Sequence, residues 1–160
     1  MKILKECFNS DPALFLGLAE GTDARQLYLC EVECFPRDPW SEASFSENLK
    51  NDACTMLCVY NMQLQKIVAY SVVFVAGDEG DLANIAVLPR CRGEGLGGAL
   101  LDEILKKAFS DGASQMFLEV RESNSPAIGL YRSRSFTEIG KRRRYYKNPT
   151  EDAVLMMRSL

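Results

Sequence analysis

Residues 92–98 read Arg92-Gly93-Glu94-Gly95-Leu96-Gly97-Gly98, so four glycines fall within six consecutive positions. The stretch 84–87 before this run is typical of a strand, and the leucines after it recur at helical spacing. Four glycines are costly to order, at about 0.5–1 kcal/mol each relative to alanine, and a plain turn does not need them. Converging backbone N–H groups at the start of a helix form a cradle for phosphate. The run therefore predicts a strand, a phosphate-binding loop and a helix in succession.

A dinucleotide is one candidate ligand for this loop. Gly93, Gly95 and Gly98 spell G-x-G-x-x-G, and Glu119 follows at a distance of about 20 residues. However, residues 88–92 separate the glycines from the preceding strand, whereas the dinucleotide motif places them directly after it. An antiparallel meander also precedes the loop, and no Gly-Lys-Ser/Thr follows it, which excludes a Walker A loop. A tight turn without any ligand is the structural alternative.

Outward from the loop, hydrophobic periodicity predicts a mixed α/β fold. Residues 14–35 read as mostly helical, with an interruption at residues 21–23. A helix is expected after the N-cap Ser41, with Trp40 and Phe45 packed as a hydrophobic staple. The later predicted elements are strands at 55–60, 67–75 and 82–87, a helix from Leu96 that Gly112 ends, a strand at 116–120, a helix from Asn124 to about Arg134, and strands at 136–145 and 153–157.

Composition limits the kinds of protein this chain can be. The 160 residues, 47% hydrophobic and 26% charged, suit one domain spanning residues 1–160. The absence of histidine excludes Ser-His-Asp triads, Cys-His dyads and His-ligated metal sites. A net charge of −3 gives no overall drive toward nucleic acid or an anionic membrane. No signal peptide or transmembrane run is visible, so we expect a cytoplasmic protein with reduced thiols.

The cysteines allow two interpretations. Cys30 with Cys34, and Cys54 with Cys58, have a spacing that fits a loose four-thiolate zinc site. Both pairs lie in apolar helical or strand patterns, where cysteine acts as a small hydrophobic residue. We expect core packing and no metal, and the sequence leaves the reactivity of Cys91 open.

The pattern Arg92-x-x-Gly95-x-Gly97, between a strand and a helix, resembles the acetyl-CoA pyrophosphate loop of the GCN5-related N-acetyltransferase (GNAT) family. The likeness extends roughly over residues 38–158, while the first 37 residues match weakly. Trp40-Ser41-Glu42, Asn84-Ile85-Ala86-Val87 and Glu151-Asp152-Ala153 resemble the branch that acetylates ribosomal-protein alanines (RimI type). Further matching segments are Leu118-Glu119-Val120-Arg121, Ser123-Asn124, Ala127-Ile128, Leu130-Tyr131, Phe136 and Tyr145-Tyr146.

This resemblance implies a fold, a reaction and a set of site residues. The fold is a splayed mixed sheet, with the coenzyme between strands 82–87 and 115–120. The reaction is acetyl transfer from acetyl-CoA, without a metal, to the α-amine of a protein N-terminus such as that of a ribosomal protein. A monomer or weak dimer is expected. The implied coenzyme-binding residues are Ile85, Ala86, Val87, Arg92, Gly93, Glu94, Gly95, Leu96, Gly97, Gly98 and Asn124.

The resemblance also assigns catalytic and substrate-binding roles, and each has a structural alternative. Glu119 is implied as the general base, acting through water, and Tyr131 as the acid that protonates the coenzyme A thiolate. Trp40 and Tyr145 are implied to wall the peptide path. The alternatives are a Glu119 ion pair with Arg121 or Arg132, a Tyr131 core aromatic, a helix cap at Asn124 and a staple at Trp40.

The residues themselves support part of this assignment. Strand alternation places Phe117 and Glu119 on one face, opposite Met116, Leu118 and Val120. A carboxylate in so apolar a strand should be partly desolvated, which raises its pKa toward that of a useful base. We expect Glu94 to face solvent, since a carboxylate repels pyrophosphate. The run 141–144 is either a solvated edge or a positive rim near the cleft or the coenzyme A 3′-phosphate.

The acceptor is the least determined part. An α-amine with a pKa of about 7.7–8.0 is about one-tenth neutral at pH 7, whereas a lysine amine is almost wholly charged. Deprotonating an α-amine therefore costs less free energy than deprotonating a lysine, which suits a site with a single carboxylate base. The rivals are a GNAT enzyme acting on a small amine, an antibiotic or a lysine side chain, and a non-catalytic acyl-CoA-binding subunit.

Overall fold

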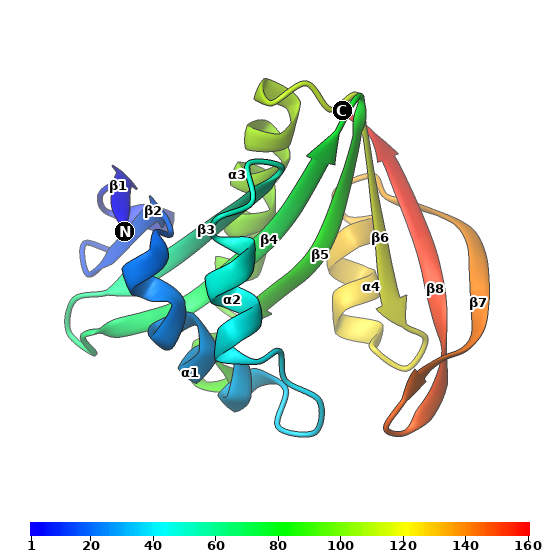
Figure 1. The fold of residues 1–160 in the computed structure, drawn as a ribbon, viewed down its shortest axis with the longest axis horizontal. Coiled ribbons are helices and arrows are strands. Elements are labelled where there is room, and N and C mark those ends of the chain that lie inside the picture. The colour runs from blue at the N-terminus through cyan, green and yellow to red at the C-terminus, as the bar shows by residue number, and fades with distance from the viewer.

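The computed structural model describes all residues, Met1–Leu160, and arranges its strands in one eight-stranded sheet of order β1-β2-β3-β4-β5-β6-β8-β7 (Figure 1). Only β5 and β6 are parallel neighbours; the other pairs are antiparallel. The strands are β1 (Lys2–Lys5), β2 (Leu14–Leu18), β3 (Cys54–Asn61), β4 (Lys66–Ala76), β5 (Glu79–Val87), β6 (Gln115–Arg121), β7 (Thr137–Lys147) and β8 (Thr150–Ser159). The helices are α1 (Ala24–Cys34), α2 (Glu42–Asn48), α3 (Leu96–Ser110) and α4 (Ser125–Arg132).

The helices form two layers around the sheet. α1 and α2 lie on one face, and α3 and α4 lie on the other (Figure 1). From Ser41 onward the predicted order is confirmed: a helix, a three-stranded antiparallel meander, the βαβα unit and two last strands. None of the helices has the length and apolarity needed to cross a membrane.

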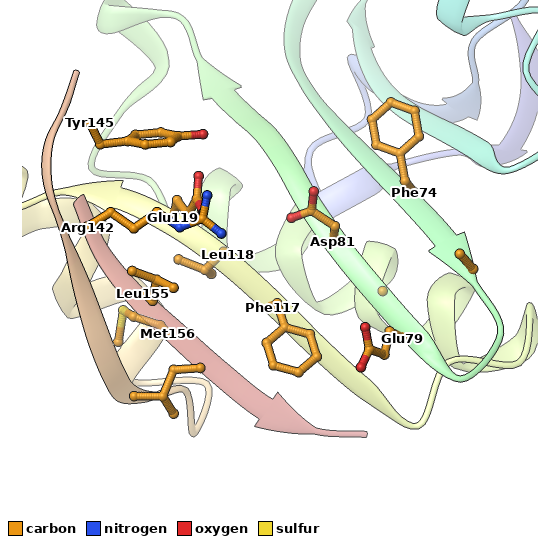
Figure 2. A pocket seen from close by; sticks show the side chains of 13 residues that line it. Phe74, Glu79, Asp81, Phe117, Leu118, Glu119, Arg142, Tyr145, Leu155 and Met156 are labelled. Atoms are coloured by element: carbon orange, nitrogen blue, oxygen red, sulfur yellow. Dashed lines mark ion pairs between the residues drawn. The ribbon is translucent and has the colours of Figure 1, made fainter. Parts of the chain in front are cut away.

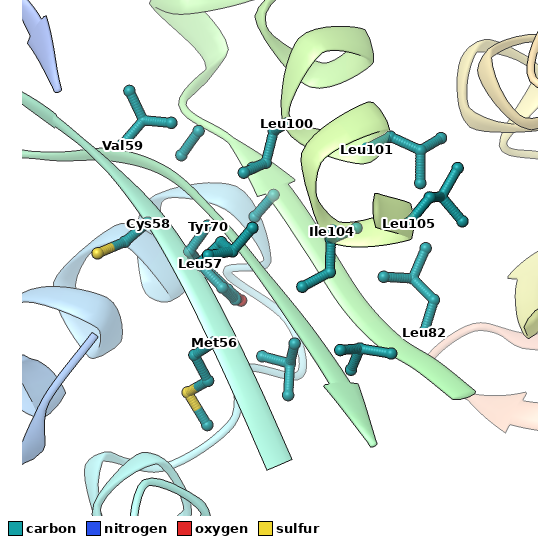
Figure 3. Packing of buried hydrophobic residues seen from close by; sticks show 14 of the residues in the cluster. Met56, Leu57, Cys58, Val59, Tyr70, Leu82, Leu100, Leu101, Ile104 and Leu105 are labelled. Carbon is teal, nitrogen blue, oxygen red and sulfur yellow. The ribbon is translucent and has the colours of Figure 1, made fainter. Parts of the chain in front are cut away.

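The core is built around β4, the central strand of the meander. Every residue from Ile67 to Val73 is buried, which explains why this segment reads as a continuous hydrophobic run. On one face, leucines and Ile104 of α3 pack against the sheet (Figure 3). On the other face, Tyr70 meets the ring of Phe45 from α2 edge-on, with ring centres 5.5 Å apart. Both helix layers are thus fixed by the same strand.

The prediction for residues 14–35 is wrong in its first third. Residues 14–18 form β2, which pairs with β3 from Leu14 opposite Asn61 to Leu18 opposite Leu57. α1 begins only at Ala24, after a short 3-10 turn at Gly21–Asp23. A five-residue apolar run fits a strand and a buried helix equally, and the partner that favours the strand lies about 40 residues away. Other element ends differ from the prediction by a few residues.

The local helix signals before α2 and α4 are confirmed. Ser41 caps α2, since its hydroxyl accepts a hydrogen bond from Ser44 N at 3.0 Å. Trp40 packs on Phe45 with ring centres 5.7 Å apart, as the staple requires. The Asn124 side chain caps α4 by accepting a hydrogen bond from Ala127 N at 3.3 Å.

The sheet opens between its two parallel strands, as predicted. β5 and β6 pair only where residues 79–81 lie opposite residues 115–117. Beyond Asp81 and Phe117 they diverge, which leaves the inner edge of residues 82–87 without a neighbouring strand (Figure 1). A register shift opposite Val72 and Val73 marks an irregularity in β5 where this divergence begins. The fold thus supplies an open strand edge next to the glycine loop.

Candidate active site

The glycine loop joins the end of β5 to α3 through two left-handed residues. Gly93 has φ +85° and Gly95 has φ +78°, a region that costs about 1–2 kcal/mol for a residue with a Cβ. Gly95 is also the N-cap of α3, so the first N–H groups of the helix face the loop. Glu94 is exposed, as predicted. The loop therefore has the backbone geometry of an anion cradle.

The side chain of Arg92 anchors the loop to the strand. Its Nε donates a hydrogen bond to the carbonyl oxygen of Val87 at 2.9 Å. Ile85, Ala86 and Val87 lie on the part of β5 that β6 leaves unpaired. The predicted pyrophosphate loop and the predicted pantetheine edge are thus contiguous.

The last two glycines of the loop differ in the space that a side chain would find there. A Cβ on Gly97 would lie 3.5 Å from Val87 Cγ2, in ordinary contact. A Cβ on Gly98 would collide with the guanidinium of Arg134, which pairs with Asp102 at 3.2 Å. Leu96 is buried and fixes the first turn of α3 to the core. The guanidinium is the far end of a flexible side chain, so a Cβ at Gly98 would require Arg134 to shift and would disturb its pair with Asp102.

We expect Gly95→Ala to raise the KM for acetyl-CoA by about 5- to 30-fold, with kcat within threefold of the wild-type value. The range converts a left-handed strain of about 1–2 kcal/mol, which the loop relieves by turning its N–H groups away from the cradle. Steady-state kinetics at varied acetyl-CoA checks this. Gly129→Ala in α4 is the control, because its Cβ meets nothing within 4 Å. An unchanged KM for Gly95→Ala contradicts the cradle.

Glu119 lies in a cavity of about 460 Å³ at the junction of β5, β6, β7 and β8 (Figure 2). The predicted alternation is confirmed: Met116, Leu118 and Val120 are buried on the opposite face of β6. The walls combine apolar and charged side chains, among them Phe74, Glu79, Asp81, Phe117, Ile139, Arg142 and Tyr145. Three of these cavity residues, counting Glu119, carry carboxylates.

The ion-pair partner of Glu119 differs from both predicted ones. Arg142 Nε lies 3.0 Å from Glu119 Oε1. Arg121 instead pairs with Glu151 at 3.2 Å, and Arg132 pairs with Glu138. Arg142 lies 23 positions along the chain from Glu119, on β7, and β8 separates the two strands in the sheet. Local spacing therefore gave no signal for this pair.

The Glu119 carboxylate raises the pKa of two further groups in the cavity. The Glu119 carboxylate raises the pKa of the Tyr145 phenol, whose hydroxyl points toward it in Figure 2. Burial, followed by the like charge of Glu119, raises the pKa of the Asp81 carboxyl group, while Arg142 opposes this shift. Arg142 also lies 5.6 Å from the centre of the Tyr145 ring. Glu119, Arg142, Tyr145 and Asp81 form one electrostatic unit.

Tyr131 lies on α4, outside the residues that line this cavity. It is 6% exposed and contacts Phe136, with ring centres 5.8 Å apart. Burial raises the pKa of its phenol, so the hydroxyl keeps its proton at neutral pH. The Tyr131 hydroxyl has no hydrogen-bond partner in the protein. It is nevertheless not fully enclosed, because Ser71 Oγ is the only enclosed side-chain oxygen or nitrogen that lacks a partner.

The two residues implied to wall the peptide path, Trp40 and Tyr145, lie in different parts of the structure. Tyr145 lines the cavity and is 44% exposed, whereas Trp40 lies elsewhere, just before α2.

All six cysteines are free, with Cys30 and Cys58 buried. No group of three or more His, Cys, Asp or Glu side chains is placed to hold a metal ion.

One buried polar cluster, around Glu31, was not predicted from the sequence. Glu31 is buried inside α1 and hydrogen-bonds Tyr70 of β4. The only available signal was its place on the apolar stripe of the helix, four residues after the buried Leu27.

Comparisons with known proteins agree with this geometry. Residues 23–136 match the family model described as acetyltransferase (GNAT) family. The [ribosomal protein bS18]-alanine N-acetyltransferase of Escherichia coli K12 is 38% identical over 120 residues, covering 74% of this chain and 79% of that protein. The Haemophilus influenzae enzyme of the same name is 33% identical over 140 residues, covering 86% and 92%.

A solved structure extends the match to the fold. The crystal structure of the Escherichia coli ribosomal-protein-S18-alanine N-acetyltransferase superposes with a TM-score of 0.82 and 34% identity. The superposition covers 91% of this chain and 93% of that one. The chain therefore belongs to the GNAT family and is an N-acetyltransferase.

Proposed function

We propose that the protein transfers an acetyl group from acetyl-CoA to the α-amine of a protein N-terminus, and that a ribosomal protein is its acceptor. The observation that carries this proposal is the similarity, at 33–38% identity over most of the chain, to enzymes named for alanine acetylation of ribosomal protein bS18. Ribosomal proteins are made in the cytoplasm, so the proposal places the enzyme there. It also treats residues 1–160 as one functional unit.

The coenzyme has a site that suits its shape and charge. The pyrophosphate accepts hydrogen bonds from the N–H groups of the glycine loop and the first turn of α3. The pantetheine amides pair with the free edge of β5 at Ile85–Val87, as an added strand does. Asn124 caps α4 and lies at the start of that helix, where it also contacts the pantetheine arm in this proposal.

The reaction is a direct transfer in a ternary complex. The neutral amine attacks the thioester carbonyl, so a C–N bond forms and the C–S bond then breaks. Glu119 accepts the proton that the amine loses, through a water molecule. The Tyr131 hydroxyl, which burial keeps protonated at neutral pH, donates its proton to the departing thiolate. The Arg142 ion pair fixes the orientation of the Glu119 carboxylate.

The cavity suits an acceptor that arrives as a cation. Glu79, Asp81 and Glu119 face one space in which Arg142 is the only cationic side chain. Carboxylates attract an ammonium group, so these side chains favour binding of the charged amine, which gives up its ammonium proton to water before it attacks the thioester. Phe74, Phe117 and Tyr145 provide apolar walls for the neighbouring peptide residues.

Two matched peptides test the acceptor. We expect thiol release from acetyl-CoA with a peptide that has a free N-terminal alanine and no lysine. A peptide with a blocked N-terminus and one internal lysine should react at least 100-fold more slowly, because at pH 7 its amine is neutral in under one-hundredth of the fraction expected for an α-amine. Thiol release is measured spectrophotometrically, and the acetylated position by mass spectrometry.

Other outcomes of these assays identify the alternative functions. Turnover of the lysine peptide alone overturns the α-amine acceptor while leaving the acetyltransferase activity in place. Turnover of small amines alone assigns the protein to that class of GNAT enzymes. Tight acetyl-CoA binding without turnover of any amine supports a non-catalytic acyl-CoA-binding subunit.

A further inference from the structure

The Glu31 carboxylate is a buried acid that the proposed reaction does not use. Its side chain belongs to α1, is 1% exposed and does not line the cavity around Glu119. Its partners are hydrogen-bond donors and none is a cation. Replacing a buried polar group and its partners by apolar groups of the same shape is often nearly neutral or stabilising. Stability alone therefore gives no reason for a carboxylate at this position.

Three other segments converge on this carboxylate. Trp40 N, just before α2, donates a hydrogen bond to Glu31 Oε1 at 2.9 Å. The Tyr70 hydroxyl on β4 donates to Oε2. Asn84 Nδ2 on β5 lies 2.9 Å from the Tyr70 hydroxyl and 3.5 Å from Glu31 Oε2. A carboxylate can only accept, and here both of its oxygens have donors.

The ends of this network lie at two parts of the proposed ternary complex. Trp40 belongs to the segment assigned to the peptide path, and Asn84 directly precedes the coenzyme-binding edge Ile85–Val87. Glu31 thus connects the acceptor side to the coenzyme strand through α1 and Tyr70. Burial raises the pKa of the Glu31 carboxyl group, and the hydrogen bonds from Tyr70, Trp40 and Asn84 oppose that shift.

We propose that Glu31 is a positioning residue, which holds Trp40 and the start of α2 in register with β5 so that the acceptor peptide binds. This inference rests on the proposed function, in which Trp40 walls the peptide path. Glu31 touches neither substrate; it acts through the backbone of Trp40.

The test uses Glu31→Leu, which removes every acceptor at this point. We expect the KM for the alanine peptide to rise about tenfold or more, as the loss of a charge-assisted hydrogen bond implies, with kcat within threefold. Trp40 is the only tryptophan, so its fluorescence reports on this contact without any acceptor present. Its emission should shift to longer wavelength as the indole becomes more exposed.

Two variants sharpen the comparison. Glu31→Gln keeps a carbonyl oxygen for Trp40 N and should restore most of the acceptor KM and the emission wavelength. Glu33→Gln is the matched control on the same helix, because Glu33 is exposed and pairs only with Lys66, at 2.7 Å. It should change neither KM nor emission.

Several results overturn the inference. An acceptor KM within twofold of wild type for Glu31→Leu does so, even when the melting temperature falls, since that marks a packing role only. Unchanged Trp40 emission does so as well. If Glu31→Leu fails to fold, Tyr70→Phe replaces it: the ring stays in the core, one donor is lost, and a KM rise of less than about twofold contradicts the proposal.

The proposed function can fail separately. If wild-type protein acetylates no N-terminal peptide, the proposed function is wrong. The comparison of Trp40 emission between wild type and the Glu31 variants still tests the contact between Glu31 and Trp40. The KM is then measured with whichever amine the enzyme does acetylate.

Discussion

Glu119→Gln is expected to lower kcat about 10²- to 10⁴-fold, the range that general base catalysis contributes. The amide keeps the size of the carboxylate but cannot accept the proton that the attacking amine loses. Acetyl-CoA affinity should stay within threefold, because the glycine loop and the edge of β5 lie on other segments. Single-turnover and steady-state kinetics with the alanine peptide, together with acetyl-CoA binding, measure both quantities.

The competing explanation for Glu119 is a structural ion pair with Arg142. In that case Glu119→Gln lowers the melting temperature and leaves kcat above about one-tenth of wild type. Glu122→Gln is the matched control, because Glu122 is an exposed glutamate that pairs with Lys141 just after β6. Glu122→Gln removes a glutamate–lysine pair on the surface and leaves the cavity intact, so its kcat should be unchanged.

Tyr131→Phe is expected to lower kcat about 100-fold or more, since the thiolate then leaves without a proton donor. Phenylalanine fills the same buried site beside Phe136, so the melting temperature should stay within a few degrees. Tyr28→Phe on α1 is the control, because Tyr28 lies outside the cavity, with the Arg25 guanidinium 5.6 Å from its ring centre. A kcat within threefold of wild type removes Tyr131 from the mechanism.

The Tyr131 hydroxyl is not expected to contribute to the pH dependence of the wild-type enzyme near neutral pH. Burial raises the pKa of Tyr131 above its ordinary value near 10, so the acid form persists through pH 6 to 9. The activity of Tyr131 is therefore lost only at strongly alkaline pH. Within pH 6 to 9, we expect kcat/KM to rise with pH as the acceptor amine loses its proton, both in wild type and, at a lower level, in Tyr131→Phe.

Much of the fold was accessible from local sequence patterns. The strand at 84–87, the glycine loop and α3 follow from apolar periodicity and from two left-handed glycine positions. Capping by Ser41 and Asn124, and the staple of Trp40 on Phe45, are contacts within five residues. Such signals are reliable because the atoms that interact are close in the chain.

The candidate site was predictable only in part. The face of β6 that carries Glu119 follows from strand alternation, and Tyr145 was expected beside the acceptor and lines the cavity. The ion pair between Glu119 and Arg142 was not predictable, because it depends on the register in which β7 pairs with β8. The cavity depends likewise on where β5 and β6 part, after Asp81 and Phe117, both of which line it.

Sequence alone thus predicted the helix and strand types from residue 41 onward, the position of the glycine loop between β5 and α3, and the face of β6 that bears Glu119. Tertiary structure decided the rest: that residues 14–18 extend the sheet instead of starting a helix, that Arg142 faces Glu119, and that Glu31 joins Trp40 to β5. The physical reason is range. Propensity, capping and periodicity act over a few residues, whereas strand pairing and buried polar contacts depend on partners that only the folded chain brings together.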